Sequence, residues 1–520
     1  MIERVIENWL TDVEERAFQV PFCQLLALQG HEIVHLSPHG PDEQGKDVIT
    51  IHPDGTPCAY QLKVGDITLA RWRQIVGEVE ELLDIAIHHP SVDKSKRHRA
   101  CLVVSGDLKD PVRRQIDDRN EDRRRSGGNT LDVLVKGQLL TQFTNASEHF
   151  LPREVSDLRS FLNLYARDGR APAPRSDLAQ ILRSLTGLDT ETDAKHGCRA
   201  AASGLLIGSY LIAPHEREKN WWAVADSLVI VAATACALAE KVGSYGEFRT
   251  TISLCLEGVE RALGELEKEA ANSPDLLMGT SFFDGRFVRY RATLIAGYLA
   301  ALGLTRKLLG KSDWRSDDTS QFIEQHQEAF MLYSEAAFPC FLNIIWYLEA
   351  TEKVEWAMKL LQKLINSIIA ANEHDQYELM SPYYELESIV RGQMGLAVEA
   401  ADETFAGNSY ALDSLVTLAV RSGMRKYLET KWRPISRSNM SEFVPKDTWE
   451  YYTYRARHGE LRSRFPNQTQ SWKQLVEEAA KAADELPVGI GQCPQLLPLF
   501  LLVFPHRLRL GVVKYLDDIL

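Results

Sequence analysis

Three polar side chains near the start of the chain combine a carboxylate, an amide and an amine. Asp47 opens one strand candidate, and Gln61 and Lys63 lie in the next. Because strand side chains alternate between two faces, Gln61 and Lys63 share one face. A carboxylate binds a divalent cation, an amide orients water, and an ammonium group stabilises developing negative charge. The pattern predicts metal-assisted hydrolysis.

Phosphodiester hydrolysis is the reaction that these groups suit best. It requires neutralised phosphate charge and an activated water, and bound Mg²⁺, or Mn²⁺ in its place, provides both. We expect Asp47 to be the essential metal ligand, with the backbone carbonyl of Leu62 as a further oxygen. Lys63 would hold the attacking water or stabilise charge on the phosphate. Gln61, which is neutral, would orient water or bind the metal weakly.

The elements that position these residues are predicted by periodicity and turn signals. The segment 2–28 predicts two helices, or one helix kinked at Pro21, stopping at Gly30. Strands are then expected at 31–36, 47–52, 58–64, 100–104 and 131–135, with helices at 69–83, capped by Thr68, and at 111–125. This order predicts an α/β domain with a mixed sheet, whose second and third strands form an antiparallel hairpin.

The hairpin loop decides whether Asp47 can join the other two side chains. A plain two-residue turn at Asp54-Gly55 would pair Asp47 with Leu62 and turn its side chain away from Lys63. The proposed chemistry therefore requires a three-residue loop, a bulge with Gly55 in a left-handed conformation, or a bend at Asp47.

The run Gly45-Lys46-Asp47, followed by Gln61-Leu62-Lys63 in the paired strand, resembles the restriction-endonuclease-like, or PD-(D/E)xK, nuclease superfamily. The likeness is to its modified-DNA restriction branch, in which Gln replaces the middle acid, and it covers residues 10–105. It implies an Mg²⁺-dependent endonuclease acting on DNA, with RNA as an alternative substrate. Nuclease domains joined to large helical regions also resemble bacterial effectors of restriction and of defence against phage.

The resemblance implies an acid on a helix before the first strand. The family spacing falls near Gln19, where the family usually has Glu, so this chain departs from the pattern there. We expect Glu15 to act as the catalytic helix acid and metal ligand, with Glu14 and Gln19 as rivals. Glu43 is a further acid that would compensate for a missing ligand.

Any nucleic-acid contact must be local, because the formal net charge of the chain is -13. The candidate phosphate-binding residues are Lys46, Arg71, Arg73, Lys94 and Arg97. The arginine-rich segment 113–125 carries interleaved acids, which favours a solvated helix over a phosphate-binding one.

The organisation of the chain changes after residue 160. We expect a nuclease-like domain at 1–160, a linker at 161–176, and an all-helical region at 177–520 that is helical-repeat-like or a bundle. This region would sense a trigger, form homo-oligomers or bind a partner defence protein. The segments 274–289 and 434–448 are expected loops within it.

The remaining signals concern location. The apolar run 227–239 is too short for a membrane span and predicts a buried helix, so we expect no membrane segment. The N-terminus lacks the features of a signal peptide, and the eight cysteines are scattered. These features predict a cytoplasmic protein with reduced, buried thiols.

A non-catalytic scaffold is the alternative function. Such a protein would use the nuclease-like fold to bind nucleic acid or to assemble. The two hypotheses differ in whether Asp47, Lys63 and a helix acid converge within metal-binding distance.

Overall fold

The chain forms two compact units. The computed structural model describes residues 6–520 except for 8, 12, 37–44, 90, 94–95, 149–160, 162–163, 166, 191–192, 274–284, 374–380, 394–407, 455–459 and 482–485. Unit 1 comprises Met1–Val231 and Gly246–Gly258, and unit 2 comprises Ala232–Tyr245 and Val259–Leu520. Helices α9 (Trp221–Val242) and α10 (Tyr245–Asn272) contribute residues to both units.

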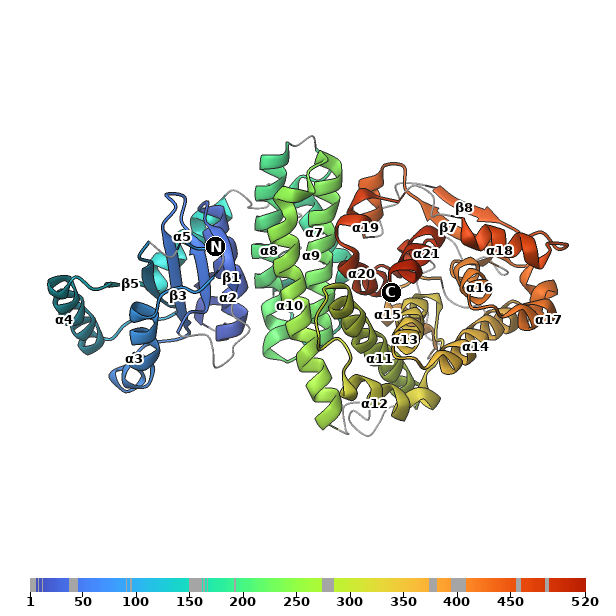
Figure 1. Ribbon diagram of the computed structural model, residues 1–520, viewed down its shortest axis with the longest axis horizontal. Coiled ribbons are helices and arrows are strands. Elements are labelled where there is room, and N and C mark those ends of the chain that lie inside the picture. The colour runs from blue at the N-terminus through green and yellow to red at the C-terminus, as the bar shows by residue number, and fades with distance from the viewer. Residues whose placement is uncertain are drawn as a thin grey trace. The chain divides into compact units, whose positions relative to one another are not determined.

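A mixed five-stranded sheet is the centre of the N-terminal part of unit 1 (Figure 1). The strands lie in sequence order: β1 (Glu32–Leu36), β2 (Val48–Ile51), β3 (Pro57–Lys63), β4 (Arg99–Val104) and β5 (Leu131–Leu134). The pairs β1·β2 and β2·β3 are antiparallel, whereas β3·β4 and β4·β5 are parallel. The predicted order of helices and strands and the predicted mixed sheet are confirmed.

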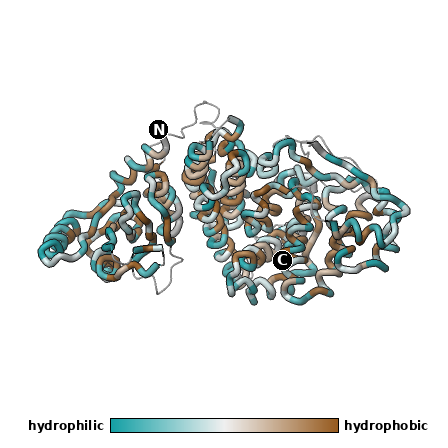
Figure 2. Tube along the Cα trace, turned by 45° about the horizontal axis from the view of Figure 1, so that its top comes forward, coloured by the Kyte–Doolittle hydropathy of each residue, from teal (hydrophilic) through white to brown (hydrophobic). Residues whose placement is uncertain are grey.

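Helices cover both faces of this sheet. On one face, α3 (Leu69–Asp84) and α4 (Asp110–Ser126) share an apolar core with residues of β3 and β4. Trp72 of α3 and Ala59 of β3 belong to this core. On the other face, Phe22 of α2 (Glu15–Leu28) meets Tyr60 of β3 with ring centroids 5.3 Å apart. Helix α5 (Lys136–Glu148) packs beside α2. Figure 2 shows the hydrophobic segments inside and the hydrophilic ones outside.

The two-helix alternative placed the boundary between the helices at Pro21, but the boundary lies at Val13 and Glu14. Helix α2 begins at Glu15, after a non-helical Val13 and Glu14, and continues through Pro21 to Leu28. A proline inside a helix removes one backbone hydrogen bond, but packing of the flanking Phe18 and Phe22, both fully buried, holds the helix together. Gly30 ends it with a φ of 90°, as predicted.

The segment expected to be a linker is anchored along its described C-terminal half. The carbonyl of Gly169 accepts hydrogen bonds from His215 and Asn220, and Arg175 forms an ion pair of 2.7 Å with the buried Asp226. Helix α8 (Ala194–Arg217) also packs along α2, and α7 (Arg175–Thr186) packs on α8. The compact units therefore do not follow the expected boundary at 161–176, because α7 and α8 belong with the sheet.

Unit 2 is largely helical, but the expectation of an all-α region is wrong. It contains a three-stranded sheet in the order β6-β7-β8. The strands are β6 (Asn408–Ser409), β7 (Asn439–Val444) and β8 (Glu460–Arg464). Strand β7 lies inside the expected loop 434–448, and it is a strand because its backbone pairs with segments that are distant in sequence. Residues 274–284 of the other expected loop, 274–289, lie outside the described residues. Residues 285–289 form the start of helix α11.

The helices of unit 2 pack through close contacts. They include α11 (Gly285–Leu308), α12 (Asp317–His326), α13 (Phe338–Ala350), α14 (Val354–Glu373), α15 (Leu386–Gln393), α16 (Leu412–Arg421), α17 (Arg425–Ile435), α18 (Trp472–Ala480), α19 (Val488–Gln492), α20 (Leu497–Val503) and α21 (Leu510–Ile519). A Cβ atom on Gly297 of α11 would lie 2.6 Å from Cβ of Cys340 in α13. A larger residue at Gly297 would therefore push these two helices apart.

Two expectations about buried segments can be compared with the structure. Helix α9 is long and apolar enough to cross a membrane by length and composition, but 89% of its most apolar window is buried inside the protein, as a core helix would be. Six of the eight cysteines are buried, and Cys198 and Cys493 are half-buried. The expectation of a buried helix at 227–239 is confirmed.

Candidate metal-dependent active site

The β2–β3 hairpin brings Asp47 beside the end of β3. The pairs Val48↔Tyr60 and Ile51↔Pro57 define the register of the hairpin. Just before β2 the backbone bends at Asp47, whose N–H donates to the carbonyl of Tyr60 at 2.9 Å. A three-residue loop, Pro53 to Gly55, sets the register: the N–H of His52 donates to Thr56 across the loop at 2.9 Å. Gly55 has a φ of 79°. Of the predicted alternatives, the three-residue loop, the left-handed Gly55 and the bend at Asp47 are all present.

Asp47 lies at a bend and is 2% exposed. Its Oδ2 accepts a hydrogen bond of 2.6 Å from the backbone N–H of Leu62. The carbonyl of Lys63 accepts from Ser105 at 3.0 Å, on the β4 side of the strand. The N–H and C=O of one strand residue point to the same side, and those of the next residue point to the opposite side. The carbonyl of Leu62 therefore points to the same side as its N–H, toward Asp47. The two oxygens predicted as metal ligands therefore lie on the same side of β3.

The ammonium group of Lys63 lies between two carboxylates. Its Nζ is 3.1 Å from Oε1 of Glu15 and 2.9 Å from Oε2 of Glu78. Burial lowers the pKa of Lys63, but the charges of Glu15 and Glu78 and their hydrogen bonds outweigh burial and raise that pKa above its ordinary value. Lys63 is therefore a fixed cation that can stabilise negative charge, and it is unsuited to act as a base.

Glu78 is the residue that the sequence interpretation missed. It lies on α3, and its Oε2 accepts a 3.3 Å hydrogen bond from Nε2 of Gln61 as well as the contact with Lys63. A weak signal was present: Glu78 follows the buried Ile75 by one helical turn, at the edge of the apolar stripe of α3. Gly45, with a φ of 70°, approaches this turn so closely that a Cβ atom would meet the Glu78 carbonyl at 2.3 Å.

Gln61 supplies an oxygen without a partner. The residue is 4% exposed, and its Oε1 is buried with no hydrogen-bond partner in the described part of the chain.

Among the described residues, no three His, Cys, Asp or Glu side chains form a group that could hold a metal ion. A divalent cation here would need amide and backbone oxygens beside carboxylates, and Gln61 and Leu62 provide them. Hard oxygen donors of this kind suit Mg²⁺ and Mn²⁺.

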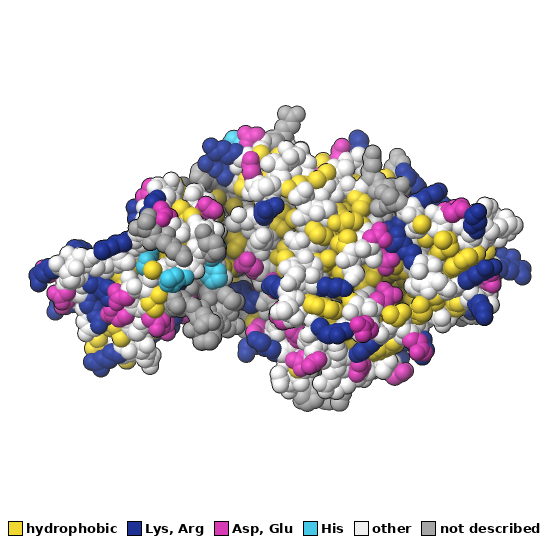
Figure 3. Space-filling model, in the orientation of Figure 1, with side chains coloured by type: hydrophobic (Ala, Val, Ile, Leu, Met, Phe, Trp, Pro, Cys, Tyr) yellow, Lys and Arg dark blue, Asp and Glu magenta, His cyan; other side chains and the backbone are white. Residues whose placement is uncertain are grey.

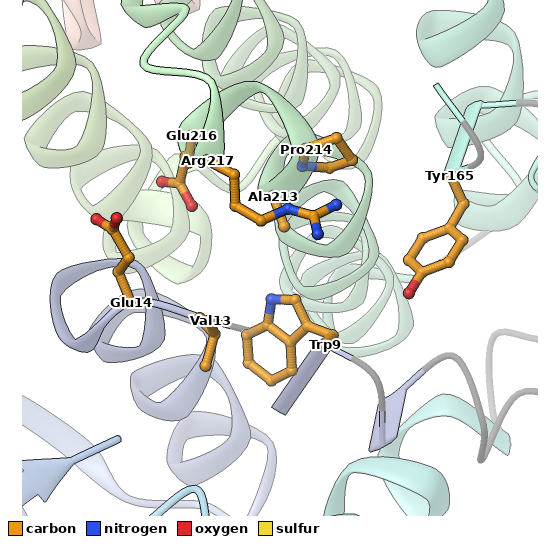
Figure 4. A pocket seen from close by; sticks show the side chains of 8 residues that line it. All are labelled: Trp9, Val13, Glu14, Tyr165, Ala213, Pro214, Glu216 and Arg217. Atoms are coloured by element: carbon orange, nitrogen blue, oxygen red, sulfur yellow. The ribbon is translucent and has the colours of Figure 1, made fainter. Parts of the chain in front are cut away.

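The structure separates the three helix-acid candidates. Glu15, at the first position of α2, reaches Lys63. Glu14 instead lines a small cavity of about 20 Å³ together with Trp9 and Arg217, and its carboxylate lies toward Glu216 (Figure 4). Gln19 is buried, with 3% of its surface exposed. Glu15 is thus the candidate that joins the site, while Glu43 lies outside the described residues.

The expected phosphate contacts differ in how far they are exposed. Lys46 is 3% exposed and donates to the carbonyl of Glu81 at 3.3 Å, and burial lowers its pKa to about 8 although Glu81 raises it. This expectation is therefore corrected for Lys46, because a buried amine bound to α3 is not presented to a phosphate. Arg71 is half-buried, Arg73 is exposed, and Arg97 is exposed but donates to the carbonyl of Gly127. Lys94 lies outside the described residues.

Acidic side chains accompany the basic ones on this surface. Arg123 of α4 pairs with Glu80 and Asp84 of α3, as the solvated-helix interpretation of 113–125 predicts. Figure 3 shows Lys and Arg interleaved with Asp and Glu over the visible face of unit 1.

Comparison with known proteins adds no relative: no family model matches the chain, no curated protein matches it, and no solved structure matches it.

Proposed function

We propose that the chain is an Mg²⁺-dependent endonuclease of the restriction-endonuclease-like type that hydrolyses phosphodiester bonds in DNA, with RNA as an alternative substrate. One observation carries the proposal. Asp47 binds the N–H of Leu62, and Lys63, the next residue of β3, lies against Glu15 from a separate helix. This proximity supports a nuclease site over a scaffold.

The roles of the residues follow from their positions. The carboxylate of Asp47, the carbonyl of Leu62 and the carboxylate of Glu15 would hold the metal ion, which supplies charge neutralisation and an activated water when bound. The amide of Gln61 orients that water. The ammonium of Lys63 stabilises the negative charge that develops on the phosphate oxygens, a contribution that is largest where water is excluded.

The helical part of the chain would control this activity. We assign it the sensing of a trigger, homo-oligomerisation or the binding of a partner defence protein, in a cytoplasmic bacterial system of restriction or defence against phage. Its mainly helical architecture supports a role in interactions.

A specific observation supports the second candidate, a non-catalytic scaffold. Asp47 is bound to the N–H of Leu62, and Lys63 is neutralised by Glu15 and Glu78. Buried polar groups that satisfy one another in this way also occur as purely structural clusters. Such a protein would bind nucleic acid or assemble without cleaving.

The test separates these functions. The purified full chain is incubated with plasmid DNA, single-stranded DNA and RNA, each with Mg²⁺, Mn²⁺ or EDTA, beside its Lys63→Ala variant. Cleavage that needs the metal and is lost in the variant supports the nuclease. Binding without cleavage under every condition favours the scaffold, and cleavage that is unchanged in Lys63→Ala contradicts the assigned site.

A further inference from the structure

Two carboxylates from separate helices converge on one ammonium group at the end of β3. Glu15 belongs to α2 and Glu78 to α3, which cover opposite faces of the sheet, and both reach Nζ of Lys63 within 3.1 Å. Their side chains are 29% and 46% exposed, while that of Lys63 is 10% exposed. With two negative charges and one positive charge, the cluster retains an excess negative charge that solvent cations can approach.

An independent observation indicates an oxygen ligand beside these carboxylates. Gln61 is more than nine-tenths buried, and its Nε2 donates to Glu78 at 3.3 Å. The other end of the same amide, Oε1, is buried without a partner among the described residues. Leaving a buried carbonyl oxygen unpaired costs free energy, and a cation would remove that cost. The cluster therefore offers two carboxylates and one amide oxygen, the ligand types that divalent cations prefer.

We propose that Glu15, Glu78 and Gln61 form a cation-exchange site, in which the ammonium of Lys63 occupies the place that Mg²⁺ or Mn²⁺ takes on binding. The inference rests on the proposed function for its catalytic meaning and adds Glu78 and a regulatory step to that site. When the divalent cation displaces it, Lys63 becomes free to contact a substrate phosphate. Without the metal, Glu15 and Glu78 hold Lys63 and keep it from the substrate.

The physical basis is competition for the same charges. An ammonium and a divalent cation cannot both occupy the space between two carboxylates, so each weakens the binding of the other. Removing the ammonium while keeping its apolar stem should therefore strengthen metal binding. Removing the charge of Glu78 should weaken it.

The experiment is calorimetric titration of Mn²⁺ into the full chain without nucleic acid. We expect Lys63→Met to bind Mn²⁺ about tenfold more tightly than the wild type, because the competing charge is gone. We expect Glu78→Gln to bind about tenfold more weakly. Glu80→Gln is the matched control, since Glu80 lies on the same helix with 38% exposure and pairs with Arg119 and Arg123 rather than with Lys63. It should bind like the wild type.

Two results overturn the proposal. One is Mn²⁺ binding by Lys63→Met that equals or falls below that of the wild type, with circular dichroism showing a folded protein. If Lys63→Met does not fold, the variant at the more exposed Glu78 provides the test. Mn²⁺ binding by Glu78→Gln that equals the binding by Glu80→Gln then overturns the proposal. Because no substrate is present, a failed cleavage assay rejects the proposed nuclease without altering this outcome.

Discussion

The carboxylate of Asp47 accepts a hydrogen bond of 2.6 Å from the backbone N–H of Leu62. This contact occurs just before β2 begins, where no β2 backbone carbonyl serves that N–H, so the side chain replaces a bond of the ladder. Asp47 therefore contributes to the fold of the hairpin as well as to the proposed chemistry, and substitutions must separate these two effects.

Substitutions of Asp47 should affect stability and cleavage differently. Asp47→Ala leaves the buried N–H of Leu62 unpaired and should lower the free energy of unfolding by about 1–3 kcal/mol. Asp47→Asn keeps an acceptor oxygen and should cost less, while cleavage is lost in both. Urea unfolding and plasmid nicking measure the two effects. Equal stability of the two variants would show that the bond to Leu62 contributes little.

Lys63→Ala should abolish cleavage with little loss of stability. Removing a group that stabilises transition-state charge costs about 10²–10³ in rate. The carboxylates that lose their partner are partly exposed, so water can solvate them. Single-turnover cleavage rates and thermal melts measure these effects, with Lys268→Ala on α10 as an exposed control. A large drop in melting temperature together with retained activity would assign Lys63 to structure alone.

The hairpin loop should tolerate Asn better than Ala at position 55. A φ of 79° suits Gly, is accepted by Asn, and costs other residues about 1–2 kcal/mol. Gly55→Ala should therefore destabilise more than Gly55→Asn in chemical unfolding. Deleting Asp54 should leave a two-residue turn and shift the register by one, which moves the carboxylate of Asp47 away from the N–H of Leu62. Full activity in that deletion variant would contradict the register argument.

The stability of a C-terminal fragment should depend on whether the fragment contains Arg175. A fragment 177–520 lacks Arg175, an ion-pair partner of the fully buried Asp226, and removing one partner of a buried pair costs about 3–5 kcal/mol. A fragment 167–520 keeps Arg175 and the contacts of Gly169 with α8. We expect the longer fragment to be the more stable in circular dichroism melts. Equal melting would show that the ion pair is dispensable.

Acidic pH should stabilise unit 2 through Glu335. Burial raises the pKa of this carboxyl to about 7 from 4.5, although hydrogen bonds from Ser409 and Tyr410 lower it. The folded state then binds more protons than the unfolded state between these values, so stability is full at low pH and is lost as pH rises through about 7. Glu335→Gln should flatten the dependence of the unfolding free energy on pH between 5 and 8. An unchanged slope would place the titration elsewhere.

Local signals in the sequence determined much of unit 1. The alternation of β3 places Gln61 and Lys63 on one face, the cap at Thr68 begins α3, and Gly30 ends α2. The turn residues left the loop at Gly55 as one of three alternatives, because they also allow a plain two-residue hairpin. These features depend on neighbours in sequence, or on pairs joined by a short turn.

Tertiary structure alone decided which side chains meet from separate elements. Glu78 reaches Lys63 only because α3 docks against the sheet at Gly45, and Lys46 is buried by the same docking. Packing also overrode the local preference of Pro21 for a helix start, and pairing of distant segments made β7 a strand. Periodicity predicts which face of an element is apolar, but the partner of that face depends on close packing between segments far apart in sequence.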